Sequence, residues 1–405
     1  MLKYIKFCIV GVFMNFIIMI ITISLTLISL TGCQSTSGYQ QKLIKVEPIY
    51  LDEQFKNFAS VEVESEKSIF ELDSDMKAMV AKELTRESSN HKKAKKLLKY
   101  FFSPEQLNLT YNKGANVIAS RAYQNKEANC LSLTIMAYAI AKASDLDVVF
   151  QSVKIPEYWM RNGRMNMLTG HVNLRVMEKS SPNKVVFFER SIAEIDFDPF
   201  VLKKTFPKKI ISKNRVIAMF YNNKGANAMV NGDYITAYAY LKAATKIDAT
   251  FSSAWGNLGI LYRFNGHEKI AIETYQYAIS INDNNLTSMS NLSLLLHRNG
   301  DYEQAKQLDA FIMRKRANNP YYYALLGDEK FYKGDYHQAI HHYRKAIQLN
   351  KNVHEFYFGL AKIYYMLDDI EKSQNYMKKA IAKNRIKQID QQYITKLNML
   401  RKIKG

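Results

Sequence analysis

The sequence repeats with a period of 34 residues, the distance from Ala218 to Ser252, as far as the neighbourhood of Lys387. A fixed period of this length is the signature of a solenoid, in which each unit buries its apolar face only by stacking on its neighbours. This part of the chain therefore has to fold as a stack with repeating contacts. The five units start at Ala218, Ser252, Leu286, Pro320 and His354.

Positions within the unit predict that it is a pair of helices. Large apolar or aromatic residues recur at the fourth and seventh positions, as at Trp255 and Leu258. The eighth position is small, which lets two helices cross closely, and the fifteenth is usually glycine, which suits a tight turn. These two positions hold Gly225, Gly259, Ser293, Gly327 and Ala361, and Gly232, Gly266, Gly300, Gly334 and Asp368, respectively.

The pattern resembles the tetratricopeptide repeat over all five units. The first unit departs from it with Lys224 at the seventh position, and the third departs with Asp309 and Ile312. The segment Gln388–Lys404 carries apolar residues at helical spacing and is interpreted as a capping helix. The resemblance implies an all-α solenoid over 214–405 whose concave face binds a peptide or protein partner. A purely structural extension of the neighbouring domain is the alternative.

The N-terminus has the pattern of a secretory leader. Basic residues precede an apolar run from Phe7 to Leu30 that contains no charged residue. The run Leu30–Cys33 resembles the bacterial lipobox, which implies that residues 1–32 are removed as a signal peptide and that Cys33 is the lipid attachment site. An uncleaved transmembrane anchor is the alternative, because an apolar run of about 18 residues or more can span a bilayer.

The leader also sets the expected location and partners. Gln34 after Cys33 resembles lipoproteins of the outer membrane, so we expect a protein that is lipid-anchored in the bacterial cell envelope, on the periplasmic side. The net charge of +20 would suit nucleic acid or an anionic surface. Nucleic acid is not an expected partner outside the cytoplasm, and lysines spread over helices fit a solvated surface. We therefore expect membrane contact through the lipid and no nucleic-acid binding.

The sequence pattern of residues 33–213 predicts an α+β domain. Helical stretches come first and strand-like runs follow, an order that favours an antiparallel sheet. The connection between Ile155 and Gly170 is expected to be a loop that borders the cleft or packs its tryptophan inward, and it contains Tyr158, Trp159, Arg161 and Arg164. The helical stretches are Ser74–Leu84, Ser88–Phe102, Lys113–Tyr123 and one beginning at Cys130, and the strands are Asp147–Val153, His171–Met177, Lys184–Arg190 and Ala193–Phe197.

A thiol, an imidazole and a carboxylate follow one another in this domain. Cys130 is the only cysteine after Cys33, and it stands at a helix start, where the helix dipole favours the thiolate. His171 is the only histidine between Cys130 and the repeats, and it can act as base and then acid. Asp196 on a later strand would orient the imidazole, with Asp198 as the alternative acid on the same side of the strand.

The segments Asn129–Thr134, Phe150–Val153, His171–Asn173 and Ile195–Pro199 resemble the core of the transglutaminase-like superfamily, which has a papain-like fold. The resemblance covers about 113–199. It implies that Cys130 is a nucleophile, with His171 and Asp196 as its catalytic partners and a thioester as the intermediate. The implied substrate is a polypeptide or another amide, and no cofactor is expected.

Two classes of function remain open. The first is a membrane-anchored cysteine enzyme of acyl transfer or amide hydrolysis, either a protease or amidase or a transglutaminase. The second is an envelope scaffold that binds proteins through its repeats and whose triad is inactive. His337 and His341, four residues apart, lack an evident third ligand, so we expect a solvated helix face and no metal site.

Overall fold

The structure of the 405-residue chain is a computed structural model. It describes residues 50–87, 89–103, 105–107, 109–112, 114–162, 165–177, 191–197, 206–384 and 387–404. The leader 1–32, Cys33, Arg164, the expected strand Lys184–Arg190 and the alternative acid Asp198 lie outside the described residues. Within the described ranges, no helix combines the length and the apolar character that crossing a membrane requires.

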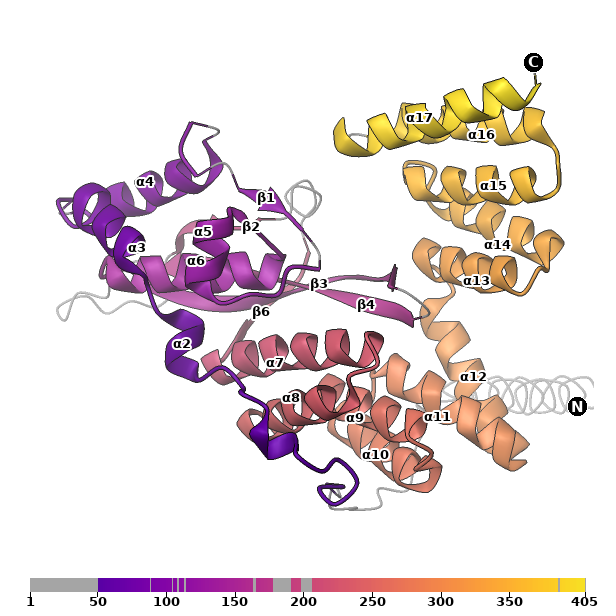
Figure 1. The fold of residues 1–405 in the computed structure, drawn as a ribbon, viewed down its shortest axis with the longest axis horizontal. Helices are drawn as coiled ribbons and strands as arrows, with labels where there is room; N and C mark the ends of the chain where they lie inside the picture. Colours follow the sequence, from indigo (N-terminus) through magenta and orange to yellow (C-terminus); the bar gives the residue numbers. More distant parts are fainter. Residues whose placement is uncertain are drawn as a thin grey trace, which may run out of the picture. The chain divides into compact units, whose positions relative to one another are not determined.

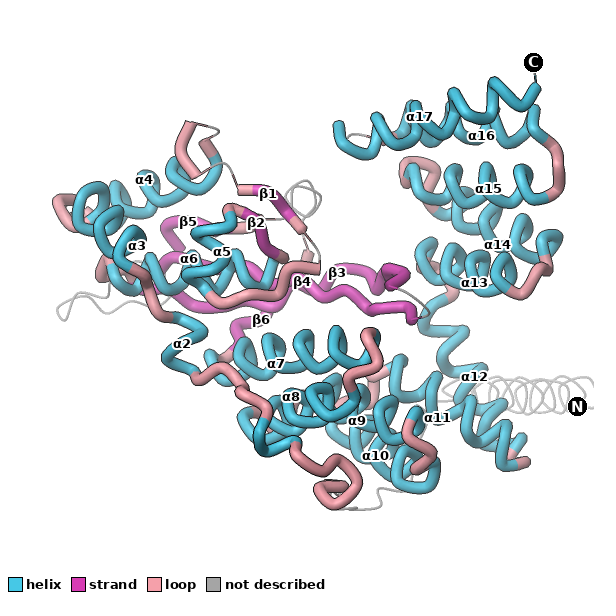
Figure 2. Tube along the Cα trace, viewed as in Figure 1, coloured by secondary structure: helices cyan, strands magenta, loops and turns pink. Residues whose placement is uncertain are grey.

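The part of the chain before the repeats packs helices against a sheet (Figure 1, Figure 2). All pairings in this sheet are antiparallel, with the strand order β5-β4-β3-β6 among the described residues. A short parallel pair, β1 and β2, lies apart from it. The helical elements are η1 (Phe58–Ser60), α2 (Glu66–Phe70), α3 (Ser74–Met79), the π-helical turn η2 (Val80–Leu84), α4 (Asn90–Phe102), α5 (Ala119–Asn125) and α6 (Cys130–Ala143), and the strands are β1 (Thr110–Tyr111), β2 (Glu127–Ala128), β3 (Asp147–Asn162), β4 (Met165–Met177), β5 (Ser191–Ile195) and β6 (Lys208–Ile211).

The expected α+β character is therefore present, with two corrections. The expected helix Lys113–Tyr123 begins only at Ala119. The connection between Ile155 and Gly170 is not a loop: it extends β3 and β4 into a long hairpin, with Tyr158 paired to Thr169. Pro156 and Gly170, residue types that interrupt regular strands, lie where the pairing register shifts at a β-bulge, so the hairpin accommodates both.

The repeats form pairs of antiparallel helices. The second to fifth units begin at Ser252, Leu286, Pro320 and His354, as the period predicts, whereas the first begins earlier, at Lys213. The glycines between the helices have positive φ, from 77° at Gly334 to 88° at Gly300, and Asp368 takes their place with φ 58°. The helices are α7 (Lys213–Val230), α8 (Tyr234–Ile247), α9 (Ser252–Phe264), α10 (Glu268–Ile281), α11 (Leu286–Asn299), α12 (Tyr302–Arg316), α13 (Pro320–Tyr332), α14 (Tyr336–Leu349), α15 (His354–Met366), α16 (Ile370–Lys383) and α17 (Lys387–Lys404).

The departures of the third repeat have a structural explanation. In the second repeat a Cβ on Gly259 would collide with the ring of Tyr275 on the partner helix. The third repeat has Ser293 and Asp309 at the corresponding positions. The Ser293 hydroxyl donates to the Asp309 carboxylate at 2.5 Å, so a hydrogen bond replaces the contact between glycine and an aromatic ring.

One hydrophobic core joins the two architectures. It contains residues of α6 and β4 and continues into the first repeat through Ile217 and Phe220 of α7. The segment 50–64 also lies against this repeat: the Tyr238 hydroxyl donates to Asp52 at 2.6 Å, and the Tyr240 hydroxyl donates to Glu64 at 2.7 Å. The N-terminal end of the described chain is therefore fastened to residues far along the sequence.

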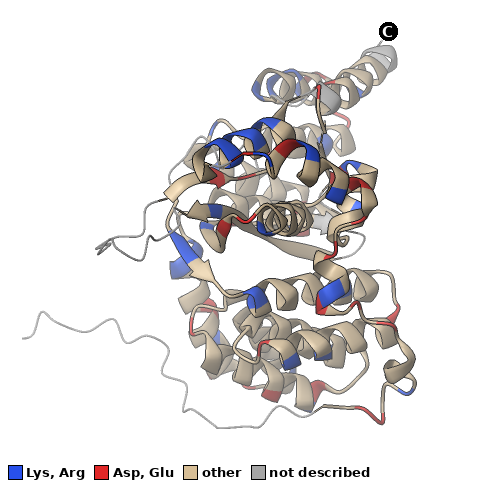
Figure 3. Cartoon of the chain, turned by 90° about the vertical axis from the view of Figure 1, so that its left-hand side faces the viewer, with Lys and Arg blue, Asp and Glu red and all other residues tan. Residues whose placement is uncertain are grey.

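Basic residues are distributed over the helices. On the face that Figure 3 shows, Lys and Arg are interspersed with Asp and Glu. Several of them form ion pairs, for example Lys96 with Glu87 at 2.7 Å and Arg298 with Glu268 at 2.8 Å.

Substitution of Gly359 by alanine tests the close packing of the last two repeats. Alanine in an unobstructed helix would stabilise the protein by about 0.5–1 kcal/mol. Here the added Cβ would overlap the ring of Tyr343, which is buried and donates a hydrogen bond to Asp328 at 2.7 Å. We therefore expect Gly359→Ala to lower the free energy of unfolding by about 1–3 kcal/mol in urea denaturation. Lys378→Ala, on an exposed position of α16, should leave it nearly unchanged.

Candidate functional site

Three elements bring the sequence-predicted residues Cys130, His171 and Asp196 together. Cys130 is the first residue of α6, and His171 lies on β4, against which α6 packs. Asp196 directly follows β5, whose Ile195 pairs with Leu174 of β4. The step from His171 to Asp196 is long in sequence, but antiparallel pairing of β4 and β5 makes it short in space.

The three side chains form a continuous chain of hydrogen-bonded atoms. Cys130 Sγ lies 3.2 Å from His171 Nδ1, and His171 Nε2 lies 2.9 Å from each oxygen of Asp196. With the Nε2 proton donated to Asp196, Nδ1 is free to accept the thiol proton. Cys130 Sγ also lies 3.2 Å from the carbonyl oxygen of Val172.

The site is buried, and its neighbouring groups shift the pKa of His171. Cys130 is 6% exposed, and His171 and Asp196 are each 4% exposed. Burial alone would disfavour a charged imidazole, but the hydrogen bonds that His171 makes to Asp196 and Cys130 outweigh it and raise the pKa of His171 from 6.5 to about 10. The folded protein therefore holds an imidazolium between the thiol and the carboxylate at neutral pH.

A second layer of polar side chains holds Asp196. The Asn173 amide, fully buried, donates to Asp196 Oδ2 at 3.1 Å. Asn173 pairs across the strands with Gln151. With its amide nitrogen turned toward Asn173, Gln151 donates to Asn173 Oδ1 at 3.1 Å, and its oxygen accepts from Arg175. These contacts fix the carboxylate that binds the imidazole.

Asparagines also fix the start of α6. Asn129 caps the helix by accepting from the Ser132 N–H at 2.8 Å, and its amide donates to Asn116 at 3.3 Å. Asn116 in turn donates to the carbonyl oxygen of Phe220 on α7 at 3.1 Å. The backbone that carries Cys130 is thus tied to the first repeat by buried amides.

Sequence reasoning missed Asn116, Gln151 and Asn173 as members of the site. Asn173 carried a usable signal, since it lies two residues after His171 and therefore on the same face of the strand. Asn116 carried none, because its stretch was predicted to be helical and its partners belong to distant elements. Tyr158 and Trp159, for which the sequence left open a place at the cleft or inward packing, lie on the β3–β4 hairpin and contact the repeats.

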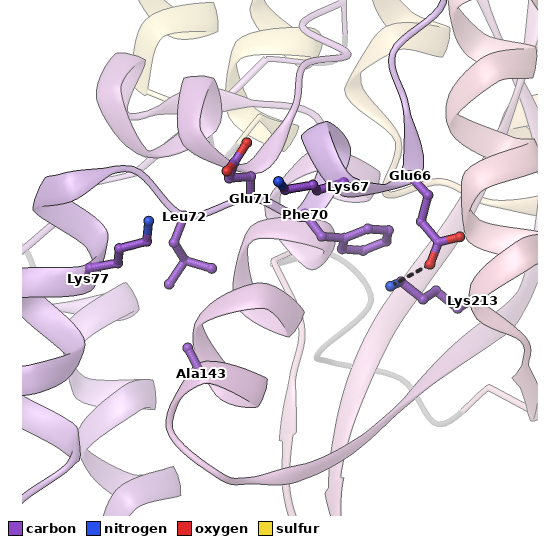
Figure 4. A pocket seen from close by; sticks show the side chains of 8 residues that line it. All are labelled: Glu66, Lys67, Phe70, Glu71, Leu72, Lys77, Ala143 and Lys213. Atoms are coloured by element: carbon purple, nitrogen blue, oxygen red, sulfur yellow. Dashed lines mark ion pairs between the residues drawn. The ribbon is translucent and has the colours of Figure 1, made fainter.

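A surface pocket lies at the other end of α6 (Figure 4). It is lined by Phe70 and Leu72, by Ala143 in the last turn of α6, and by the ion pair of Glu66 with Lys213 at 2.8 Å. Because Cys130 begins the helix that Ala143 ends, this pocket gives no access to the thiol. In the described part of the chain, no three His, Cys, Asp or Glu side chains lie close enough to hold a metal ion.

The repeats match known sequence families. Residues 252–285 and 285–320 match family models described as tetratricopeptide repeat, and residues 327–368 match one described as TPR repeat. The prediction of tetratricopeptide repeats is therefore confirmed for this part of the chain. Repeats of this kind are protein-binding modules, so the comparison supports a protein-binding function.

Curated relatives share the repeats. The chain is 30% identical over 134 residues to a TPR repeat-containing protein of Methanocaldococcus jannaschii, which covers 32% of this chain and 22% of that protein. It is 33% identical over 105 residues to the photosystem I assembly protein Ycf3 of Prochlorococcus marinus, which covers 24% of this chain and 60% of Ycf3. The chain thus spans less than two thirds of the length of these relatives.

Solved structures with partial similarity include two bacterial proteins. One is described as Pseudomonas aeruginosa pilF, with 18% identity, a TM-score of 0.30, and coverage of 47% of this chain and 87% of that one. The other is MamA, with 20% identity, a TM-score of 0.26, and coverage of 41% of this chain and 91% of that one.

The protonation state of His171 gives a test of the site. Because its folded pKa of about 10 exceeds 6.5, its contribution to the free energy of unfolding is complete below about pH 6.5 and is lost as pH rises through about 10. In ¹⁵N NMR spectra of the folded wild type, we expect His171 to be an imidazolium at pH 8. Asp196→Asn should make it neutral there.

Asp309→Asn is a matched control, since Asp309 also pairs with a histidine, His297, at 2.8 Å. It should leave the titration of His171 unchanged. A wild-type His171 that loses its proton below pH 7 would contradict the electrostatic description of the site.

Proposed function

We propose that this protein binds a partner through its repeats and that Cys130 acts on an amide bond of that partner or of a polypeptide it presents. The domain would then be transglutaminase-like, with a papain-like arrangement of helix and sheet. The comparisons support the binding half of this proposal. The chemical half is supported by one observation, the hydrogen-bonded chain from Cys130 through His171 to Asp196.

The proposed reaction uses each member of this chain. The proton of Cys130 resides on His171 Nδ1 before the attack, and Cys130 Sγ attacks the carbonyl carbon of the amide as a thiolate. The C–N bond breaks, His171 returns the proton to the leaving amine, and a thioester remains on Cys130. Water then gives a carboxylic acid, whereas a lysine amine gives a new amide. In either case the thiol is regenerated.

The surrounding residues supply orientation and charge. Asp196, held by Asn173, keeps the imidazole in place and stabilises its positive charge. The N–H of Cys130, the first residue of α6, has no partner within the helix and would donate to an oxyanion, whereas the Ser132 N–H is already bound by Asn129. Since Cys130 is 6% exposed, a polypeptide reaches the thiol only after neighbouring residues move.

A scaffold without catalytic activity is the second candidate function. It is favoured by the comparisons, because the family matches lie in the repeats and one relative is named as an assembly protein. In that case the thiol and imidazole would serve only to stabilise the start of α6. The comparisons favour this candidate over the enzyme, and the geometry of the three side chains favours the enzyme.

Thiol reactivity distinguishes the two candidates. We expect iodoacetamide to modify Cys130 readily at pH 6, because the imidazolium of His171 beside it stabilises a negatively charged sulfur. His171→Asn should slow the reaction at pH 6 by about tenfold or more, as read from the Cys130 peptide by mass spectrometry. A wild-type thiol that reacts slowly and only above about pH 8.5 supports the scaffold.

Activity is measured as incorporation of a fluorescent amine into casein and as cleavage of casein. We expect both Cys130→Ala and His171→Asn to abolish whichever activity the wild type has. Full activity in Cys130→Ala would show that Cys130 is not the nucleophile.

We further propose that the protein is held in the bacterial envelope by a lipid on Cys33. The support is the sequence around this residue, Leu30–Cys33, and Gln34 after it. Expression of Cys33→Ser should move the protein from the membrane fraction to the soluble fraction and remove incorporation of labelled fatty acid. If Cys33→Ser stays in the membrane fraction as the wild type does, and neither protein incorporates labelled fatty acid, an uncleaved anchor is favoured.

A further inference from the structure

The outer half of the β3–β4 hairpin lies on the repeats, close to the junction of α12 and α13 (Figure 1). Glu157 of β3 accepts two hydrogen bonds from Arg316, at 2.7 Å from Nε and 3.0 Å from Nη2. The Asn319 amide donates to the Glu157 carbonyl oxygen at 2.7 Å. Both the backbone and the side chain of Glu157 are therefore bound.

Aromatic rings complete the contact. The guanidinium of Arg316 lies 4.8 Å from the ring centre of Trp159 and 5.4 Å from that of Tyr322. The rings of Tyr158 and Tyr321 are 5.8 Å apart. Arg316 is only 4% exposed, so its charge depends on Glu157 and on these rings.

Arg316 is an exception within the repeat pattern. It occupies the thirty-first position of its unit, and a short polar residue occupies that position in the other units, namely Asp248, Asn282, Asn350 and Asn384. The stacking of helices therefore does not require an arginine there. Its role is defined by what it binds, a carboxylate next to aromatic rings.

The hairpin can leave this surface without unpairing the strands at the site. Val153 pairs with His171, the register then shifts, and pairing resumes at Tyr158 with Thr169. Glu157 lies in the interrupted segment. The bulge separates the outer hairpin from the inner part of the sheet, and it is directly adjacent to His171.

We propose that Arg316, Asn319, Tyr321 and Tyr322 form a docking surface for a protein segment that has a carboxylate followed by aromatic residues. Glu157, Tyr158 and Trp159 are its internal occupant. A partner protein with this chemistry competes with the hairpin for Arg316 and displaces it. This inference rests on the proposed function only in its second part: displacement frees the segment beside His171 and alters access to Cys130.

A peptide of residues 154–162 tests the docking surface. Its affinity for the full-length wild type is reduced by the fraction of molecules in which the hairpin occupies the surface. We expect it to bind a Glu157→Gln protein about tenfold or more tightly than the wild type, measured by fluorescence anisotropy. The same peptide carrying glutamine at position 157 should bind that variant about tenfold or more weakly.

Asp248→Asn is the matched control. It also removes the charge of a carboxylate that pairs with an arginine, since Arg215 Nη2 lies 3.4 Å from Asp248. The Asp248→Asn protein should bind the peptide with the affinity of the wild type. Equal binding by all three proteins, or binding that ignores the glutamate of the peptide, would overturn the proposal. Hydrogen exchange of residues 158–162 and 165–169 should be faster in Glu157→Gln and unchanged in Asp248→Asn, and unchanged exchange in both would also count against it.

The coupling to the catalytic site has its own readout. Saturating peptide should change the rate at which iodoacetamide modifies Cys130 by about threefold or more in the wild type, in which the hairpin occupies the surface before the peptide binds. Peptide that binds without changing this rate would refute the coupling. If Cys130 proves inert in every variant, the proposed catalysis fails, while the affinities still decide whether the docking surface exists.

Discussion

The burial of α6 is the constraint on which the rest of the structure depends. This helix is apolar around nearly its whole circumference, and it packs against β3 and β4, α5 and the first helix of the repeats. A helix covered on all sides has a fixed axial position, so its first residue, Cys130, stands at a defined place beside β4. Its ends are fixed as well: Asn129 caps the start, and the buried ammonium of Lys93 donates to the carbonyl oxygen of Ser144 at the end, at 2.9 Å.

The repeats were predictable because their determinants are local and recur. Turn glycines and small crossing positions placed the starts of four units correctly, and even the irregular third unit follows from one compensating pair, Ser293 with Asp309. The outer hairpin was not predictable by the same means. The connection between Ile155 and Gly170 was expected to be a loop, and the residue that holds it, Arg316, lies 159 residues away from Glu157 in sequence.

The candidate site, like the fold, was only partly predictable from the sequence. The order of a thiol at a helix start and an imidazole on an alternating strand identified Cys130 and His171, and these side chains do meet. Chain order said nothing about Gln151 or Asn116, whose contribution arises from cross-strand register and from contact with α7. The residues that hold a site in place are those that long-range packing brings next to it, and a single sequence does not reveal these contacts.

The fastening of residues 50–64 to the first repeat has a consequence for biosynthesis. Asp52 emerges from the ribosome well before Tyr238, from which it is separated by 186 residues. Its neighbour Phe55 stacks on Tyr238 with 4.3 Å between ring centres, so this contact too can form only after Tyr238 has been synthesised. The segment 50–64 therefore reaches its final contacts only once the first repeat has left the ribosome.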